Sequence, residues 1–211
     1  MEHGELALDL GTVNRRVKGL AMAQSADIRE RLLGEGVRIV AGTARLSDEI
    51  RGLAEHRVEV IGSDGAAGET LECDVVLIAT GADPRLLAGA EPDGERILDW
   101  RDVYDLDEMP EHLVVVGSGV TGAEFASGYL EAGVPVTLVS SRDQVLPGED
   151  SDAAAVVEEV FKARGGRIAE RGRAASVTRT EKGVRVDLTD GRTVEGSHAL
   201  MTVGTVPNTA G

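Results

Sequence analysis

Residues 112–126, with the sequence HLVVVGSGVTGAEFA, decide the fold of this chain. The apolar run at 113–116 is typical of a strand buried in a parallel sheet. A glycine-rich turn of the form GxGxxG follows at 117–122, and residues 123–132 have the apolar spacing of a helix. A second apolar run, 136–139, comes at the distance expected of a βαβ unit. GxGxxG alone is a weak signal, but between a strand and a helix it predicts a dinucleotide-binding α/β fold.

Each glycine of this turn has a separate expected task. Gly117 permits the tight turn, Gly119 lets the backbone approach a pyrophosphate, and Gly122 lets the helix pack closely on the strand. Unpaired N–H groups at the start of the helix, together with the helix dipole, favour an anion there. The alternative is a glycine turn that binds nothing. The candidate pyrophosphate contacts are Gly117, Ser118, Gly119, Val120, Thr121 and Gly122.

The end of the second strand bears on the choice between NADH and NADPH. An acidic residue there, about 20 residues past the glycines, would bind the ribose 2′-hydroxyl, but this chain has Ser140. Arg142 follows closely and is either an attractive charge for a 2′-phosphate or a solvated surface residue. Glu124, in the first turn of the helix, either complements the helix dipole or points toward the nicotinamide ribose.

Composition excludes several classes of function. The 211 residues are 42% hydrophobic but only 2% aromatic, so aliphatic side chains must fill the core. A net charge of -15 argues against nucleic-acid binding, which needs a basic surface. The single cysteine, Cys73, and the scattered histidines give no metal-site spacing. No apolar stretch reaches the ~20 residues that span a bilayer, and residues 1–5 do not resemble a signal peptide, so we expect a cytoplasmic protein.

The chain contains an internal repeat. Each half has a helix, a short strand, a small antiparallel meander and a closing apolar strand that ends at a glycine, Gly81 or Gly204. The glycine-rich strand–turn–helix occurs only in the second half. We therefore expect two nucleotide-binding modules, of which the first is incomplete. The expected order is the latter part of a first module at 1–84, a linker at 85–111, a dinucleotide-binding domain at 112–204 and a return to the first module at 205–211. The expected strands of the first half are 37–40, 56–61 and 74–79.

These motifs resemble the flavoprotein disulfide reductase family of pyridine nucleotide oxidoreductases, which includes lipoamide dehydrogenase and glutathione reductase. The similar segments cover nearly the whole chain, and their sequences most resemble those of the NAD(P)H–quinone reductase branch. They are the ATG-ended run at 75–81, GSGVTGAEFA at 117–126, VLPGED at 145–150 and TVGTVPN at 202–208.

The resemblance implies a function and further site residues. In that family the first module binds FAD and the second binds NAD(P)H, and hydride passes to the flavin and then to a quinone or a disulfide. It implies that Ser140 faces the adenosine ribose and that Ala174 and Gly204 line the NAD(P)H. It also implies FAD contacts from the backbone at Ala44, Thr80, Gly81 and Ala82, and a homodimer for a complete protein.

The sequence also departs from the family pattern. It lacks the FAD glycine motif, the redox CxxxxC, the FAD-binding Asp segment and the dimerisation domain, so we expect part of a longer protein. The usual Gly-Arg-x-Pro-Asn has Thr205 in place of Arg, and Val120 stands where an aromatic gate can occur. The alternatives are a non-catalytic dinucleotide-binding module and an inactive fragment. Catalytic residues are not identified, and we expect no turnover by the isolated chain.

Overall fold

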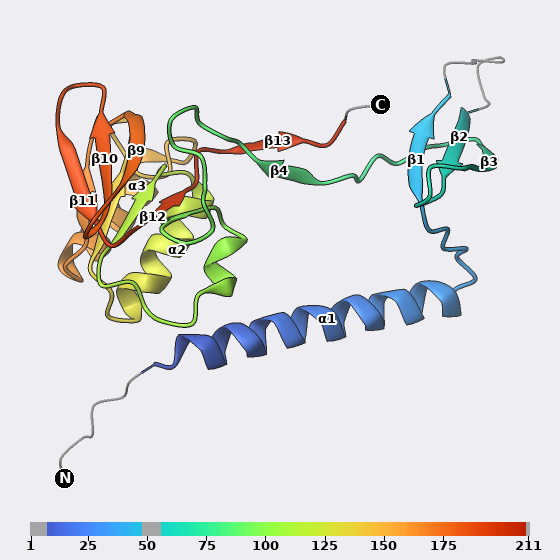
Figure 1. Ribbon diagram of the computed structural model, residues 1–211, viewed down its shortest axis with the longest axis horizontal. Coiled ribbons are helices and arrows are strands. Elements are labelled where there is room, and N and C mark those ends of the chain that lie inside the picture. The colour runs from blue at the N-terminus through green and yellow to red at the C-terminus, as the bar shows by residue number, and fades with distance from the viewer. Residues whose placement is uncertain (1–7, 48–55, 210–211) are drawn as a thin grey trace, which may run out of the picture. The chain divides into compact units, whose positions relative to one another are not determined.

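The computed structural model describes residues 8–47 and 56–209 (Figure 1). The chain divides into two units, Met1–Leu20 with Asp83–Val206, and Ala21–Ala82 with Pro207–Gly211. Helix α1 (Leu10–Gly34) runs from the first unit into the second. Its buried Asn14 donates to the backbone oxygens of Val103 and Leu106, at 3.1 and 2.8 Å, inside the first unit.

A five-stranded parallel sheet forms the centre of the first unit. Residues 113–116 pair with 136–139 in the register Leu113↔Val136 to Val116↔Val139, as predicted for the βαβ unit. The order is β5-β12-β6-β7-β8, which places β12 and β5 on the side of β6 opposite to β7. The strands are β5 (Ile97–Leu98), β6 (Leu113–Val116), β7 (Val136–Val139), β8 (Arg167–Ala169) and β12 (His198–Met201).

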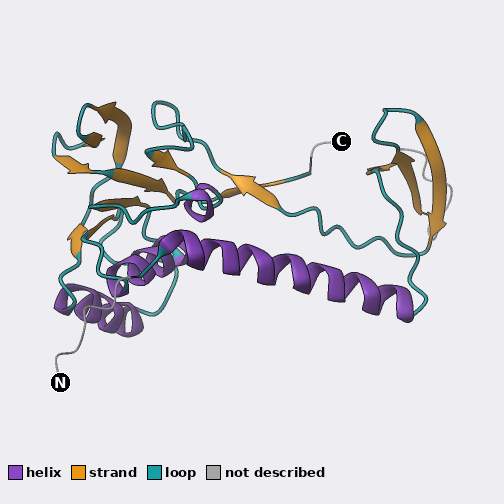
Figure 2. Ribbon diagram, turned by 60° about the horizontal axis from the view of Figure 1, so that its bottom comes forward, coloured by secondary structure: helices purple, strands orange, loops and turns teal. Residues whose placement is uncertain are grey.

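Alternation along the strands builds a core on each face of this sheet, because successive side chains of a strand point to opposite faces. Val115 belongs to a core cluster that includes side chains of α2 (Val120–Glu131), α3 (Ser151–Ala163) and the 3-10 helix η1 (Asp102–Asp105). Val114 packs on the other face against an antiparallel meander. Figure 2 shows the two helices and the meander on opposite sides of the sheet. The meander, in the order β11-β10-β9, consists of β9 (Ala174–Thr180), β10 (Gly183–Leu188) and β11 (Thr193–Gly196). The α/β fold predicted from the glycine motif is confirmed.

The second unit contains an antiparallel sheet in the order β1-β2-β3. Strand β2 lies at the predicted residues, and its register with β3 runs from His56↔Cys73. The strands are β1 (Thr43–Leu46), β2 (His56–Ile61) and β3 (Ala67–Cys73). Two further short strands, β4 (Ala82–Pro84) and β13 (Thr205–Pro207), pair with each other.

Two of the strands predicted in the first half are wrong. Residues 37–40 and 74–79 are irregular, and the strand in this region is β1 instead. The side chains of Val75 and Leu77 are 82% and 88% exposed. An apolar run becomes a buried parallel strand only if neighbouring strands pair with it. Among the described residues, no strand pairs with either segment.

Candidate dinucleotide site

A cavity of about 600 Å³ lies at the carboxyl ends of β6, β7 and β12. This is where open α/β sheets bind ligands, because the strand order reverses direction there. Among the described residues that line the cavity, none is acidic, although the chain contains 37 acidic residues. The lining residues are Arg85, Leu87, Trp100, Val116, Gly117, Ser118, Gly119, Val120, Thr121, Val139, Ser141, Arg142, Pro147, Gly172, Arg173, Ala174, Met201, Thr202, Val203, Gly204 and Thr205.

Two glycines of the turn are required by the protein itself. Gly117 has a φ of 113°, and a Cβ there would lie 2.3 Å from the carbonyl oxygen of Thr202. A Cβ at Gly122 would lie 1.9 Å from the carbonyl oxygen of Gly117. Thr202 also fixes the turn, since its hydroxyl donates to Val116 and Gly117 carbonyl oxygens, at 2.9 and 3.0 Å.

Gly119 differs from both of these glycines. Its φ of -70° and ψ of -175° suit any residue, and a Cβ there would meet no atom within 4 Å. The fold therefore gives no steric reason for glycine at this position. Gly119 is also the N-cap of α2 and supplies no side-chain cap to the first-turn amides. Those amides are left open at the positive end of the helix dipole, an arrangement that suits an anion.

The Ser140 side chain lies inside the protein. The residue is 0% exposed, and its Oγ is 2.8 Å from Oγ of Ser118 and 3.1 Å from the Arg142 carbonyl oxygen. These bonds tie the end of β7 to the glycine turn. The resemblance implies that Ser140 faces the adenosine ribose, but Ser141 and Arg142 line the cavity at this strand end instead.

In the part of the chain that the structure describes, three arginines line the cavity: Arg85, Arg142 and Arg173. Arg142 follows β7 and Arg173 precedes β9, so both lie at the β7 end of the cavity. Arg85 lies at the other end, where its backbone N–H donates to the Gly204 carbonyl oxygen at 3.0 Å. Sequence reasoning missed Arg85, Arg173 and Trp100, because they belong to no motif and come from three separate connections.

Of the other predicted NAD(P)H contacts, two lie apart from the cavity and two line it. Gly122 packs inside the turn, and Glu124 is exposed on α2 without lining the cavity. Ala174 and Gly204 do line it.

Within the described residues, no group of three or more acidic, histidine or cysteine side chains could hold a metal ion. In the same residues, no helix combines the length and apolarity needed to cross a membrane.

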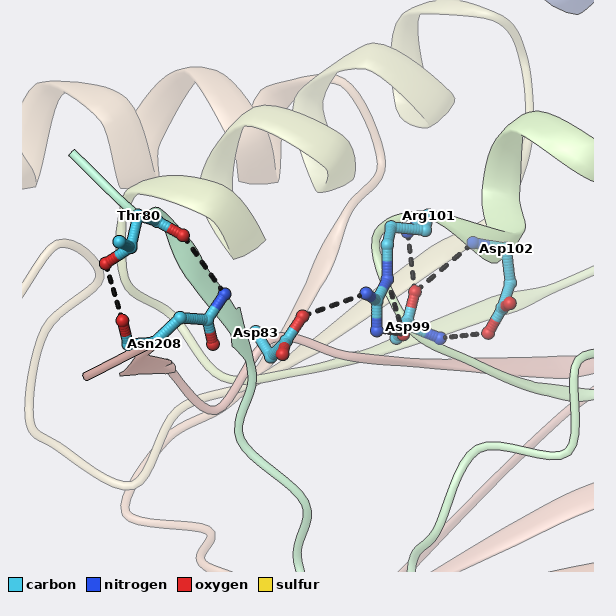
Figure 3. Close-up of polar contacts among 6 residues, drawn as sticks. All are labelled: Thr80, Asp83, Asp99, Arg101, Asp102 and Asn208. Carbon is cyan, nitrogen blue, oxygen red and sulfur yellow. Dashed lines mark hydrogen bonds and ion pairs between the residues drawn. The ribbon is translucent and has the colours of Figure 1, made fainter. Parts of the chain in front are cut away.

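The four predicted flavin contacts belong to the second unit. Ala44, Thr80, Gly81 and Ala82 are all exposed. The Thr80 hydroxyl donates to the carbonyl oxygen of Asn208, whose Nδ2 donates back to the Thr80 carbonyl oxygen at 3.3 Å (Figure 3). The Asn208 backbone N–H also donates to Gly81, at 3.0 Å. These bonds fix the 80–82 backbone, with Gly81 at a φ of 74°.

The amino-acid sequence of this chain is similar to those of known proteins. A family model described as "Pyridine nucleotide-disulphide oxidoreductase" matches residues 10–211. The chain is 59% identical over its whole length to "NAD(P)H dehydrogenase (quinone)" of Mycobacterium tuberculosis, of which it covers 43%. It is 31% identical to a dihydrolipoyl dehydrogenase of Zymomonas mobilis, with 95% of the chain and 42% of that protein covered.

The chain is also similar to solved structures. The crystal structure of LpdA from Mycobacterium tuberculosis matches 99% of this chain and 45% of that one, with a TM-score of 0.90 and 60% identity. The flavoprotein disulfide reductase RclA of Escherichia coli, at 22% identity and a TM-score of 0.74, shares the fold; 96% of this chain and 44% of that one are covered. The chain thus spans less than half the length of these relatives.

Proposed function

The chain belongs to the pyridine nucleotide-disulphide oxidoreductase family, and from this premise we propose that its parallel-sheet unit binds NAD(P)H for a flavin-dependent oxidoreductase. The complete protein would pass hydride from NAD(P)H to FAD and on to a quinone or a disulfide. The name of the 59% identical relative, "NAD(P)H dehydrogenase (quinone)", favours a quinone.

The observation that carries this proposal is the contrast among the three glycines. Gly117 and Gly122 are needed for internal packing, whereas the space in front of Gly119 is free. A glycine without a packing reason, beside open helix amides, fits a backbone that must approach a pyrophosphate. The residues present therefore suit a dinucleotide.

The chain's own residues would position the dinucleotide. The amides of Gly119, Val120 and Thr121 would bind the pyrophosphate, and the end of β7 would hold the adenosine. Because the described lining residues include Arg142 and Arg173 and none of them is acidic, the cavity would accept a 2′-phosphate as well as a hydroxyl. The bound nicotinamide supplies the hydride, while the protein supplies position and electrostatics.

The second unit would contribute to flavin binding in the complete protein. The exposed residues Ala44, Thr80, Gly81 and Ala82 would provide the FAD contacts that the resemblance implies. In this account residues 1–84 and 205–211 belong to the flavin module, 85–111 connect the modules, and 112–204 form the NAD(P)H domain. We further propose a cytoplasmic homodimer for the complete protein.

Calorimetric titration of the 211-residue chain with NADH and with NADPH tests the proposed function. We expect both to bind, with affinities within about tenfold, or ~1.4 kcal/mol. Absence of binding by both dinucleotides to folded protein would overturn the proposal. Exclusion of NADPH by about a hundredfold, or ~2.7 kcal/mol, would contradict the account of the β7 end.

A further inference from the structure

The strand order determines which part of a bound dinucleotide lies at each end of the cavity. Adenosine belongs at the end of β7, and the pyrophosphate belongs at the glycine turn after β6. Strands β12 and β5 lie on the opposite side of β6. The nicotinamide half must therefore extend over the carboxyl ends of β12 and β5.

Trp100 occupies this end of the cavity. It lies two residues after β5, lines the cavity together with Arg85 and Gly204, and is half-buried. It is also the only tryptophan of the chain, in which aromatic residues amount to 2%. Trp100 belongs to neither hydrophobic core cluster of the described residues.

The residues on either side of Trp100 hold the segment in place. Arg101 donates from Nη1 to Asp83, at 3.1 Å, and from Nη2 and Nε to one oxygen of Asp99, at 3.0 and 3.2 Å (Figure 3). The other oxygen of Asp99 accepts the backbone N–H groups of Arg101 and Asp102, at 2.6 and 3.3 Å. We call Asp83, Asp99, Arg101 and Asp102 the Arg101 bracket.

The Arg101 bracket is more than a surface ion pair. Asp99 is only 7% exposed. Its burial disfavours the charged form, but hydrogen bonds from the Arg101 side chain and from two backbone amides outweigh this effect and hold the pKa of Asp99 below its ordinary value. The Arg101 guanidinium also lies 5.7 Å from the centroid of the Trp100 ring, within the range of a cation–π contact. The residues before and after Trp100 are therefore held in place, and the Arg101 side chain lies against the indole.

We propose that Trp100 is the wall against which the nicotinamide nucleoside of NAD(P)H packs, and that the Arg101 bracket positions it there. This inference rests on the proposed function, since it concerns the same cavity. A flat aromatic ring offers a partner for another planar ring, as bases stack on aromatic side chains in nucleic-acid complexes. Trp100 would thus contribute to binding of the nicotinamide half and not of the adenosine half.

Two ligands separate these halves. NADH carries the nicotinamide ring, whereas ADP-ribose has the same adenosine, pyrophosphate and second ribose without it. We expect Trp100→Ala to weaken NADH binding by calorimetry about tenfold, within the range for loss of one stacked base. ADP-ribose should bind Trp100→Ala and wild type with about equal affinity. Trp100→Phe, which keeps a flat ring, should restore most of the NADH affinity.

The Arg101 bracket is tested by a spectroscopic signature. Because Trp100 is the only tryptophan, its fluorescence anisotropy reports the mobility of this one side chain. Arg101→Ala should lower the anisotropy of the ligand-free chain and weaken NADH more than ADP-ribose. The exposed Arg179 provides a matched control, since it pairs with Glu95 at 2.7 Å and does not line the cavity. Arg179→Ala should change neither quantity.

The outcomes distinguish this inference from the proposed function. If Trp100→Ala weakens NADH and ADP-ribose equally, or weakens neither, Trp100 is not the nicotinamide wall, although the cavity still binds a dinucleotide. If Trp100→Phe fails to restore affinity, stacking is not the interaction. If folded wild type binds neither ligand, the proposed function and this inference fall together.

Discussion

Replacement of Gly119 by valine should prevent dinucleotide binding while the chain still folds. The backbone at Gly119 is extended and the space in front of it holds no atom within 4 Å, so the folded chain can accept the side chain. Valine is a poorer N-cap than glycine, and we expect a cost of about 1 kcal/mol in stability. The branched carbons would occupy the space through which the pyrophosphate approaches.

The size of the effect follows from the hydrogen bonds that are lost. A hydrogen bond to a charged group contributes about 1.5–3 kcal/mol. Displacing the pyrophosphate from two helix amides would therefore cost about 3–6 kcal/mol, or roughly 150- to 20,000-fold in affinity. Calorimetric titration with NADH should show no measurable binding to Gly119→Val.

Gly128 offers a matched control in the same helix. It is exposed, a Cβ there would meet no atom within 4 Å, and it does not line the cavity. Gly128→Val should bind NADH as wild type does. If Gly119→Val is folded by circular dichroism and binds NADH with unchanged affinity, the reasoning from the glycine turn is refuted.

Three further predictions concern charge, pH and flavin. The double variant Arg142→Glu, Arg173→Glu should lower the calorimetric affinity for NADPH more than the affinity for NADH, because two carboxylates would face the 2′-phosphate. If both affinities fall equally, these arginines do not recognise the 2′-phosphate. The pKa values of His112 and His198 are lowered first by burial and then by Arg167 and Arg96 respectively. Below about 6.5, the ordinary pKa, the unfolded chain therefore binds protons on these rings more readily than the folded chain does. Urea unfolding should accordingly show stability falling as pH drops below about 6.5, with a weaker fall in the double variant His112→Gln, His198→Gln; identical pH slopes would contradict this. With FAD added, the 211-residue chain should stay colourless after gel filtration and show no quinone reductase activity. The reason is that Ala44 and residues 80–82 offer few contacts to offset the association entropy. If stoichiometric flavin elutes with the chain, the flavin site is misplaced.

The sequence predicted the parallel βαβ unit well and the first half poorly. Strands β6 and β7 lie at the predicted residues, because a buried run, a glycine turn and a helix all specify the same local structure. Residues 74–79 have an equally apolar pattern but no strand pairing, since periodicity reports the tendency to be buried and not the presence of neighbours. Strand β1, exposed at all four residues, gave no hydrophobic signal.

The candidate site was predictable where a motif encodes it. The spacing of glycines identified the turn from Gly117 to Thr121, all of which lines the cavity. The direction of the Ser140 side chain could not be inferred, because it depends on the hydroxyl of Ser118 across the turn. The strand order brings three further residues to the cavity, and no local sequence pattern specifies that order. These residues are Arg85, Trp100 and Arg173.

Binding of a dinucleotide pyrophosphate at the glycine turn is tested by an amide-resolved NMR titration of the 211-residue chain with NADPH. We expect saturation at one dinucleotide per chain, with the largest chemical-shift changes at the amides of Gly119, Val120 and Thr121. Saturable binding that leaves these three amides unperturbed, or no binding at all, would contradict it.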